Sequence, residues 1–123
     1  MTKAELIAAL EAATGPSREL DAEIWFSGAA LVNGPVKKGF DDYGGAHRTH
    51  WTKGSIGIWD DKLLNYTASL DAALMLVPEG MMWDVESRNA AFVGFASAPV
   101  RQFVIGSTPA IALCIAALRA RST

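Results

Sequence analysis

The clearest hydrophobic pattern in the chain lies near its end. Positions 111, 114, 115 and 118 carry Ile, Cys, Ile and Leu, and the i, i+3, i+4, i+7 spacing forms one apolar face of a helix. Thr108 is a good N-cap residue and Pro109 suits the first helical position. Arg119 and Arg121 place positive charge where the helix dipole favours it. The pattern predicts a packing helix from 109 to about 121.

Three further helices are predicted by similar signals. Thr2 and Glu5 form a capping-box pattern ahead of an apolar stripe, and Gly15-Pro16 ends that helix. Ser17 is expected to begin a second helix that reaches residue 25 or 26. A third helix is expected to start after Thr67 or Ser69 and to end at Pro78-Glu79-Gly80.

Strands are predicted between the third and last helices. The segment 82–86 alternates between apolar and polar residues, and 91–95 and 100–105 follow after short breaks. Sequential strands with short links favour an antiparallel meander. The expected fold is α+β: a small antiparallel sheet of three to four strands packed with helices in an α/β/α-type sandwich.

The segment from about 28 to 57 has a different character. Seven of the eleven glycines fall within it, and apart from a short strand-like stretch at 55–59 it shows no periodicity. We therefore expect a glycine-rich insertion or long loop within a single domain spanning residues 1–123. Long connections in small domains are often functional.

Composition narrows the functional classes. Half of the 123 residues are apolar and the net charge is -2, so non-specific nucleic-acid binding is not expected. The single cysteine, Cys114, excludes a disulfide framework within the chain and falls on the apolar face of the last helix. No stretch approaches a membrane span, and the N-terminus lacks a signal-peptide pattern. These features predict a cytoplasmic location.

Two stretches together resemble a known family. They are 66–74 with Val77-Pro78, and 108–118, and the opening 15–21 is also similar. All three resemble the small phage and prophage proteins grouped as the phage ABA sandwich domain, over residues 1–25 and about 64–121. The resemblance implies a helix–sheet–helix sandwich and a phage or prophage origin, so the expected cytoplasm is that of a bacterial host cell. That family has no established common activity, so the resemblance supplies no catalytic residues.

A cationic and aromatic group stands out within the unmatched segment. Between positions 37 and 53 the sequence contains four Lys or Arg residues but only two Asp residues. Cations can hold phosphates or acidic protein surfaces, and aromatic rings can stack on bases. The alternative is that the aromatic residues anchor a loop to the core. The candidate binding residues are Lys38, Tyr43, His47, Arg48, His50 and Trp51.

Other candidate chemistry is weaker. His47 and His50 would share one face only on a helical turn, where they could hold a metal with Asp41 or Asp42. Neither Asp41-Asp42 nor Asp60-Asp61 comes with an identifiable catalytic partner. No nucleophile elbow or phosphate loop is present. No catalytic residues, metal or cofactor are therefore predicted.

The leading hypothesis is a non-enzymatic phage or prophage accessory protein that binds stoichiometrically. Such a protein could act in counter-defence by occluding a host protein or sequestering a nucleotide signal. The bulky residues among 25–26, 59 and 81–83 could form a self-association surface, so we expect a homodimer or higher homo-oligomer. A second hypothesis for the function is a structural or assembly homo-oligomer of phage origin. A third is a metal-dependent hydrolase that uses His47 and His50.

Overall fold

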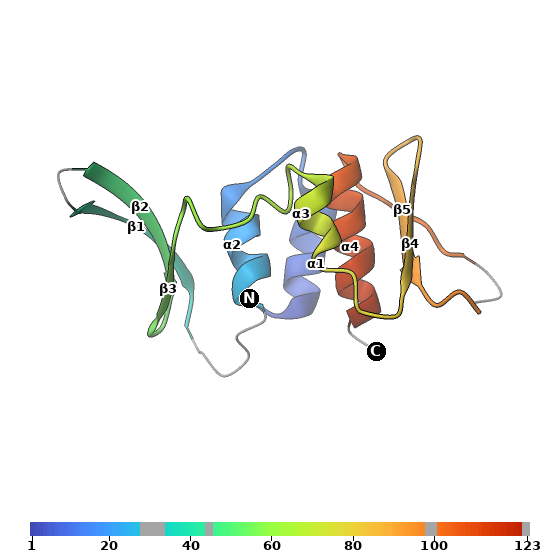
Figure 1. The fold of residues 1–123 in the computed structure, drawn as a ribbon, viewed down its shortest axis with the longest axis horizontal. Helices are drawn as coiled ribbons and strands as arrows, with labels where there is room; N and C mark the ends of the chain where they lie inside the picture. The colour runs from blue at the N-terminus through green and yellow to red at the C-terminus, as the bar shows by residue number, and fades with distance from the viewer. Residues whose placement is uncertain (28–33, 44–45, 98–100, 122–123) are drawn as a thin grey trace.

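The protein has an α+β fold in which a central layer of helices separates two small sheets (Figure 1). The computed structural model describes residues 1–27, 34–43, 46–97 and 101–121. Sheet A (β1–β3) lies at one end of the molecule and sheet B (β4–β6) at the other. The predicted α+β class is confirmed, but the chain forms two three-stranded sheets outside the helices, where a single sheet between helices was expected.

Helices α1 (Lys3–Ala12) and α2 (Arg18–Phe26) begin where the sequence predicted. The Thr2 hydroxyl accepts a bond from the Glu5 amide, and the Glu5 carboxylate accepts one from the Thr2 amide, which completes the capping box. The Ser17 hydroxyl caps α2 through the Leu20 amide. Side-chain caps thus satisfy amides that the helix backbone leaves free.

Helix α3 (Leu70–Leu74) is shorter than predicted. Ser69 caps it, but residues 75–77 form a turn instead of extending the helix to Val77. In that turn each amide bonds to the carbonyl three residues earlier, as in a 3₁₀ turn. The structure therefore selects Ser69, and not Thr67, as the cap.

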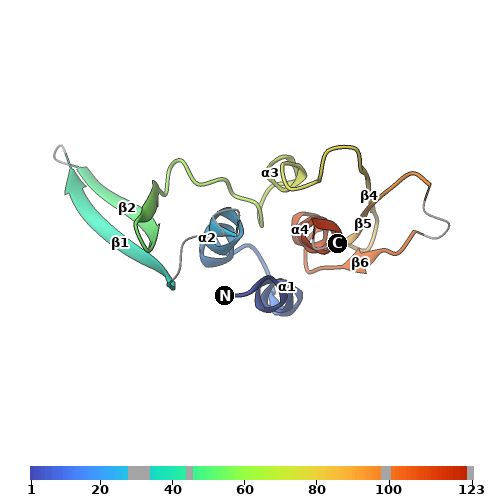
Figure 2. The ribbon, with the colours of Figure 1, turned by 90° about the horizontal axis from the view of Figure 1, so that it is seen from below.

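Helix α4 (Pro109–Arg121) is the centre of the core. The nine residues from Ala110 to Leu118 are all buried, so every side of the helix is covered. Helices α1 and α3 pack on it, and sheet B covers another side (Figure 2). Gly106 allows the preceding strand to approach closely, because a Cβ there would lie 2.6 Å from the Ala112 amide nitrogen.

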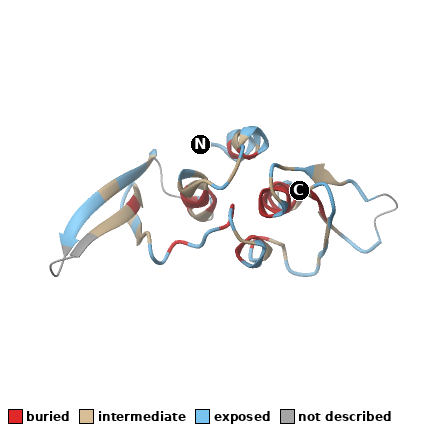
Figure 3. Cartoon of the chain, turned by 90° about the horizontal axis from the view of Figure 1, so that it is seen from above, coloured by how far each residue is buried: buried red, intermediate tan, exposed pale blue. Residues whose placement is uncertain are grey.

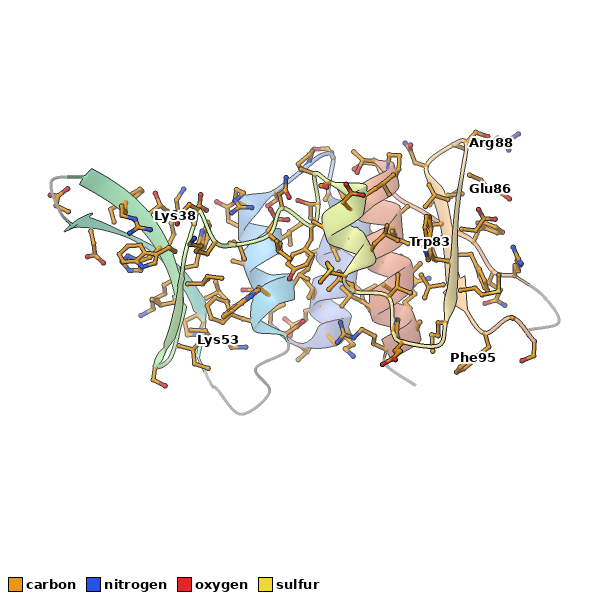
Figure 4. The ribbon with its side chains drawn as sticks, in the orientation of Figure 1. Lys38, Lys53, Trp83, Glu86, Arg88 and Phe95 are labelled. Atoms are coloured by element: carbon orange, nitrogen blue, oxygen red, sulfur yellow. The ribbon has the colours of Figure 1, made fainter. Side chains whose placement is uncertain are left out.

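Sheet B contains β4 (Met82–Glu86), β5 (Ala90–Gly94) and β6 (Val104–Ile105), all antiparallel. β4 is confirmed over its predicted length, and β5 begins and ends one residue earlier than expected. β6 is much shorter than the predicted 100–105, and residue 100 lies outside the described residues. Ala91, Val93 and Val104 face α4 and join its core, while Glu86 points away from the helices (Figure 4).

Sheet A is the main departure from prediction. β1 (Val36–Tyr43), β2 (Ala46–Lys53) and β3 (Ile56–Trp59) form an antiparallel meander where a loop was expected up to residue 54. The 55–59 strand is confirmed. The missed strands alternate poorly because both faces of the hairpin carry charged and aromatic residues, so the hydrophobic signal for a strand is weak. Residues 28–33, 44 and 45 of the same segment lie outside the described residues.

Among the described residues, none of the helices has the length and apolar character that a membrane crossing requires.

Candidate binding surface

Arg18 holds sheet A to the helices. Its guanidinium contacts the Asp60 carboxylate at 3.1 Å and donates to the Asp60 and Leu63 carbonyls at 2.9 and 3.0 Å. Its other terminal nitrogen donates to Asp21 at 2.9 Å. The planar fork of arginine can reach several acceptors at once. Arg18 therefore joins the start of α2 to the segment that leaves β3.

Asp21, which accepts from Arg18, is a buried acid that is only 1% exposed. One of its oxygens accepts from the Thr67 amide at 2.8 Å and from the Thr67 hydroxyl at 2.7 Å, and the other accepts from Arg18. The Thr67 hydroxyl also accepts from the Ser17 amide at 2.9 Å. A buried carboxylate needs such partners to offset its desolvation.

Trp51 completes what we call the Arg18 network: Arg18, Asp21, Trp51, Asp60 and Thr67. Its side chain is 2% exposed, and its indole nitrogen donates to Asp60 at 2.7 Å. This hydrogen bond is the main cause that lowers the pKa of Asp60; Arg18 adds to the effect and burial opposes both. Trp51 thus positions the sheet, and its burial leaves little of it for a ligand to contact.

We call the face of sheet A that covers α2 its inner face. Around Trp51 this face is apolar. Trp51 packs there with Ala22, Phe26 and Leu63, and side chains of Val36, Ile56 and Ile58 border the cluster. Directly opposed residues of antiparallel strands share a face, so the pairs Trp51–Ile58 and Lys38–Trp51 assign Lys38 to the inner face too. The Lys38 ammonium lies 5.5 Å from the Trp51 ring and 5.7 Å from the Phe40 ring.

The opposite, outer face of sheet A carries an arginine stacked on a tryptophan. The Arg48 guanidinium carbon lies 4.2 Å from the centre of the Trp59 ring. One Arg48 nitrogen also bonds to the Asp61 carboxylate, at 3.1 and 3.3 Å to its two oxygens. The stacking and the ion pair fix the guanidinium at a half-buried position, and strand register places Arg48 on the face opposite to that of Trp51. Most of sheet A is exposed or intermediate, in contrast to the buried helix α4 (Figure 3).

His50 lies beside this pair on the same face. Its ring meets Trp59 edge-on at 5.9 Å and covers Gly39, where a Cβ would lie 2.6 Å from the ring nitrogen Nε2. Nδ1 lies 3.0 Å from an Asp41 oxygen, although the geometry does not make a hydrogen bond. The contact is therefore an ion pair only when the ring is protonated. A shallow hollow of about 190 Å³ borders Asp41, His50 and Trp59.

The six predicted residues therefore divide between two faces. Arg48 and His50 come together on the outer face, and Lys38 and Trp51 on the inner face. Tyr43 and His47 are placed only by strand register, opposite Ala46 and Asp42; their side chains lie outside what the structure describes.

The helical turn that the metal hypothesis required is absent. His47 and His50 lie three apart on a strand, and such positions belong to opposite faces. Within the described ranges, no group of three or more His, Cys, Asp or Glu side chains could hold a metal ion.

The two members of each adjacent acidic pair, Asp41-Asp42 and Asp60-Asp61, also lie in different surroundings. Asp60 belongs to the Arg18 network, while Asp61 binds Arg48. Asp41 lies beside His50, while Asp42 follows it on β1 and so falls on the other face. Neither pair forms a carboxylate dyad of the kind used in acid–base catalysis.

The sequence did not identify Trp59 or Asp61 as partners of Arg48, nor Arg18 as the anchor of the sheet. Strand register places Trp59 opposite His50. A predicted β2–β3 hairpin would therefore have placed Trp59 on the same face as His50. Arg18 reaches residues more than 40 positions away, and no local pattern encodes such contacts.

Comparisons with known proteins found no family model, no curated protein and no solved structure that matches this chain.

Proposed function

We propose that this protein acts by stoichiometric binding to a protein partner, through the outer face of sheet A. The observation that carries the proposal is the Arg48–Trp59 stack, which is fixed by Asp61 and faces away from the helices. Arginine and tryptophan are the residues most often found at the energetic centres of protein interfaces. A side chain that is already ordered loses less entropy on binding.

The charge pattern favours a protein over a nucleotide as the ligand. Arg48 is paired with Asp61, and His50 lies beside Asp41. A phosphate would have to compete with these carboxylates or suffer their repulsion. A protein surface can instead match alternating charges with charges of its own. Sequestration of a nucleotide signal is therefore the less favoured form of the binding hypothesis.

The phage or prophage origin and a counter-defence role belong to the same proposal. Their support is the resemblance of residues 1–25 and about 64–121 to the phage ABA sandwich domain. Under this proposal, the helices and sheet B form the scaffold, and sheet A carries the specificity for a host protein that it occludes.

Site-specific photo-crosslinking tests the proposal. A benzoylphenylalanine in place of Thr52, on the outer face of sheet A, is expected to give a discrete adduct in a bacterial host extract. The same residue in place of Glu86, on sheet B, is the matched control and is expected to give none. The Thr52 adduct should disappear when Arg48→Ala is added. An adduct that survives Arg48→Ala, or forms equally from Glu86, would reject sheet A as the recognition surface.

A second candidate is self-assembly through sheet B. Ile105 is 70% exposed, and Met82, which strand register places on the same outer face of sheet B, is also exposed. Such apolar exposure is typical of interaction surfaces. Light scattering at about 1 mM protein separates the candidates: a homo-oligomer that Ile105→Lys dissociates would support assembly, and a monomer would count against it.

A further inference from the structure

A pocket of about 520 Å³ opens at the end of the helical layer, away from the faces of both sheets. Its lining comes from the start of α1, the ends of α2, α3 and α4, and the connection that leads into α3. This volume lies within the range typical of small-molecule sites.

The walls combine an aliphatic floor with a cationic rim. Ile24, Leu76 and Leu118 supply aliphatic surface, while Lys3 and Arg121 supply positive charge. No acidic side chain lies among the lining residues, and within the described residues neither cation is paired with a carboxylate.

Tyr66 supplies a polar group on the wall of the pocket. The residue is 6% exposed, yet its hydroxyl has no hydrogen-bond partner among the described residues. The hydroxyl is not among the fully buried polar atoms that lack a partner, and Tyr66 lines the pocket, so a ligand in the pocket can contact this side chain. Burial is the main cause that raises the pKa of Tyr66, and Arg121 opposes this effect from nearby. At neutral pH the hydroxyl is therefore protonated and can donate a hydrogen bond.

The helix ends do not cancel the positive rim. The carboxyl ends of α2, α3 and α4 each contribute at most roughly half a negative charge, and the amino end of α1 contributes roughly half a positive one, which sums to about one negative charge. The two full charges of Lys3 and Arg121 exceed that sum. Within the pocket, an anion is thus favoured over a cation.

We infer that this pocket binds a small organic anion, a carboxylate with an aliphatic chain. The carboxylate would accept hydrogen bonds from Arg121 and the Tyr66 hydroxyl, with Lys3 nearby, and the chain would lie along Ile24, Leu76 and Leu118. Charge-assisted bonds give orientation, and the aliphatic floor gives buried area. The site shares no residue with the outer face of sheet A, so it stands independently of the proposed function.

Calorimetric titration of the whole protein with decanoate tests the inference, with 1-decanol as the uncharged probe of the same length. Decanoate is expected to bind about tenfold or more tightly than decanol, because decanol lacks the charge. Arg121→Gln should remove that difference. Tyr66→Phe should weaken decanoate severalfold.

Arg119→Gln is the matched control, because Arg119 lies on the same helix but pairs with Glu11 and does not line this pocket. It should leave decanoate binding unchanged. Equal affinity for the two probes, no binding at about 1 mM, or equal effects of Arg119→Gln and Arg121→Gln would each overturn the inference. Circular dichroism checks the fold of each variant; if Tyr66→Phe fails to fold, the decanol and Arg121→Gln comparisons still decide.

Discussion

Sheet A and sheet B each contain three antiparallel strands, yet different interactions join them to the helices. Sheet B places Ala91, Val93 and Val104 against α4, within the main core. Sheet A has a separate and smaller apolar cluster around Trp51, and the Arg18 network reinforces it. Apolar contact is largely insensitive to exact geometry, whereas a buried ionic network depends on every partner.

This difference separates the sheet that stabilises the whole domain from the sheet that we propose to bind a partner. Because sheet B shares the core of α4, a change there alters the whole domain. Sheet A can expose a charged outer face because its contribution to the main core is small. We therefore expect variants in the core of α4 to destabilise the whole molecule, and variants of the Arg18 network to release sheet A alone.

The largest expected effect is that of Leu113→Ala in α4. Leu113 is fully buried, and such truncations cost about 2–5 kcal/mol. Urea denaturation should show this loss in a single transition. Burial raises the pKa of the Cys114 thiol to about 12, so thiol labelling should report the same unfolding. Met75→Ala, at an exposed site, is the control and should change the free energy of unfolding by less than about 0.5 kcal/mol.

Arg18→Gln should have the next largest effect, confined to sheet A. The change leaves Asp21 and Asp60 without their cation, and lost hydrogen bonds to charged groups cost about 1.5–3 kcal/mol. Amide hydrogen exchange should accelerate in β1–β3, with β5 and α4 unchanged. Labelling of Cys114 should stay slow. Faster exchange in α4 would show that the two regions unfold together, against the comparison.

Much of the helical layer could be predicted from the sequence because its signals are local. The caps at Thr2, Ser17, Ser69 and Thr108 each bond to an amide three residues on, so the sequence itself contains both partners. β4 was predictable for the same reason, since its alternation is contained within five residues.

Sheet A could not be predicted in the same way. Its strands carry charges on both faces, and Gly39 within β1 has the signature of a loop. The His50 ring, eleven residues away in sequence, covers this glycine from the paired strand. The cationic and aromatic residues were identifiable by composition, but their division between two faces follows only from strand register.

The Asp60 carboxylate makes the attachment of sheet A sensitive to acid. Its pKa in the folded protein is lowered, chiefly by the Trp51 indole, so its contribution to stability is complete above the unfolded-state value near pH 4. That contribution is lost as the pH falls through the folded-state pKa. The NMR signal of the Trp51 indole proton should therefore shift only below about pH 4. In Asp60→Asn the shift should be absent, and a shift that persists would assign the titration to another group.

The smallest expected effects come from an arginine–aromatic pair on each sheet. Arg48 lies 4.2 Å from the Trp59 ring and pairs with Asp61 at 3.1 Å, while Arg101 lies 5.5 Å from Phe92 and 3.6 Å from Asp84. Tryptophan attracts cations more strongly than phenylalanine does, and exposed pairs of this kind contribute about 0.5–1 kcal/mol.

Arg48→Ala should therefore cost more stability than Arg101→Ala, with neither exceeding about 1 kcal/mol. Chemical denaturation of both single variants measures the difference. Adding about 1 M salt should reduce both costs, because exposed ion pairs are screened. If Arg48→Ala proved the less costly change, the guanidinium would not be fixed on Trp59, and the preorganisation that recommends this face for binding would be lost. A larger cost that coincides with faster exchange throughout β1–β3 would instead make Arg48 part of the attachment of sheet A.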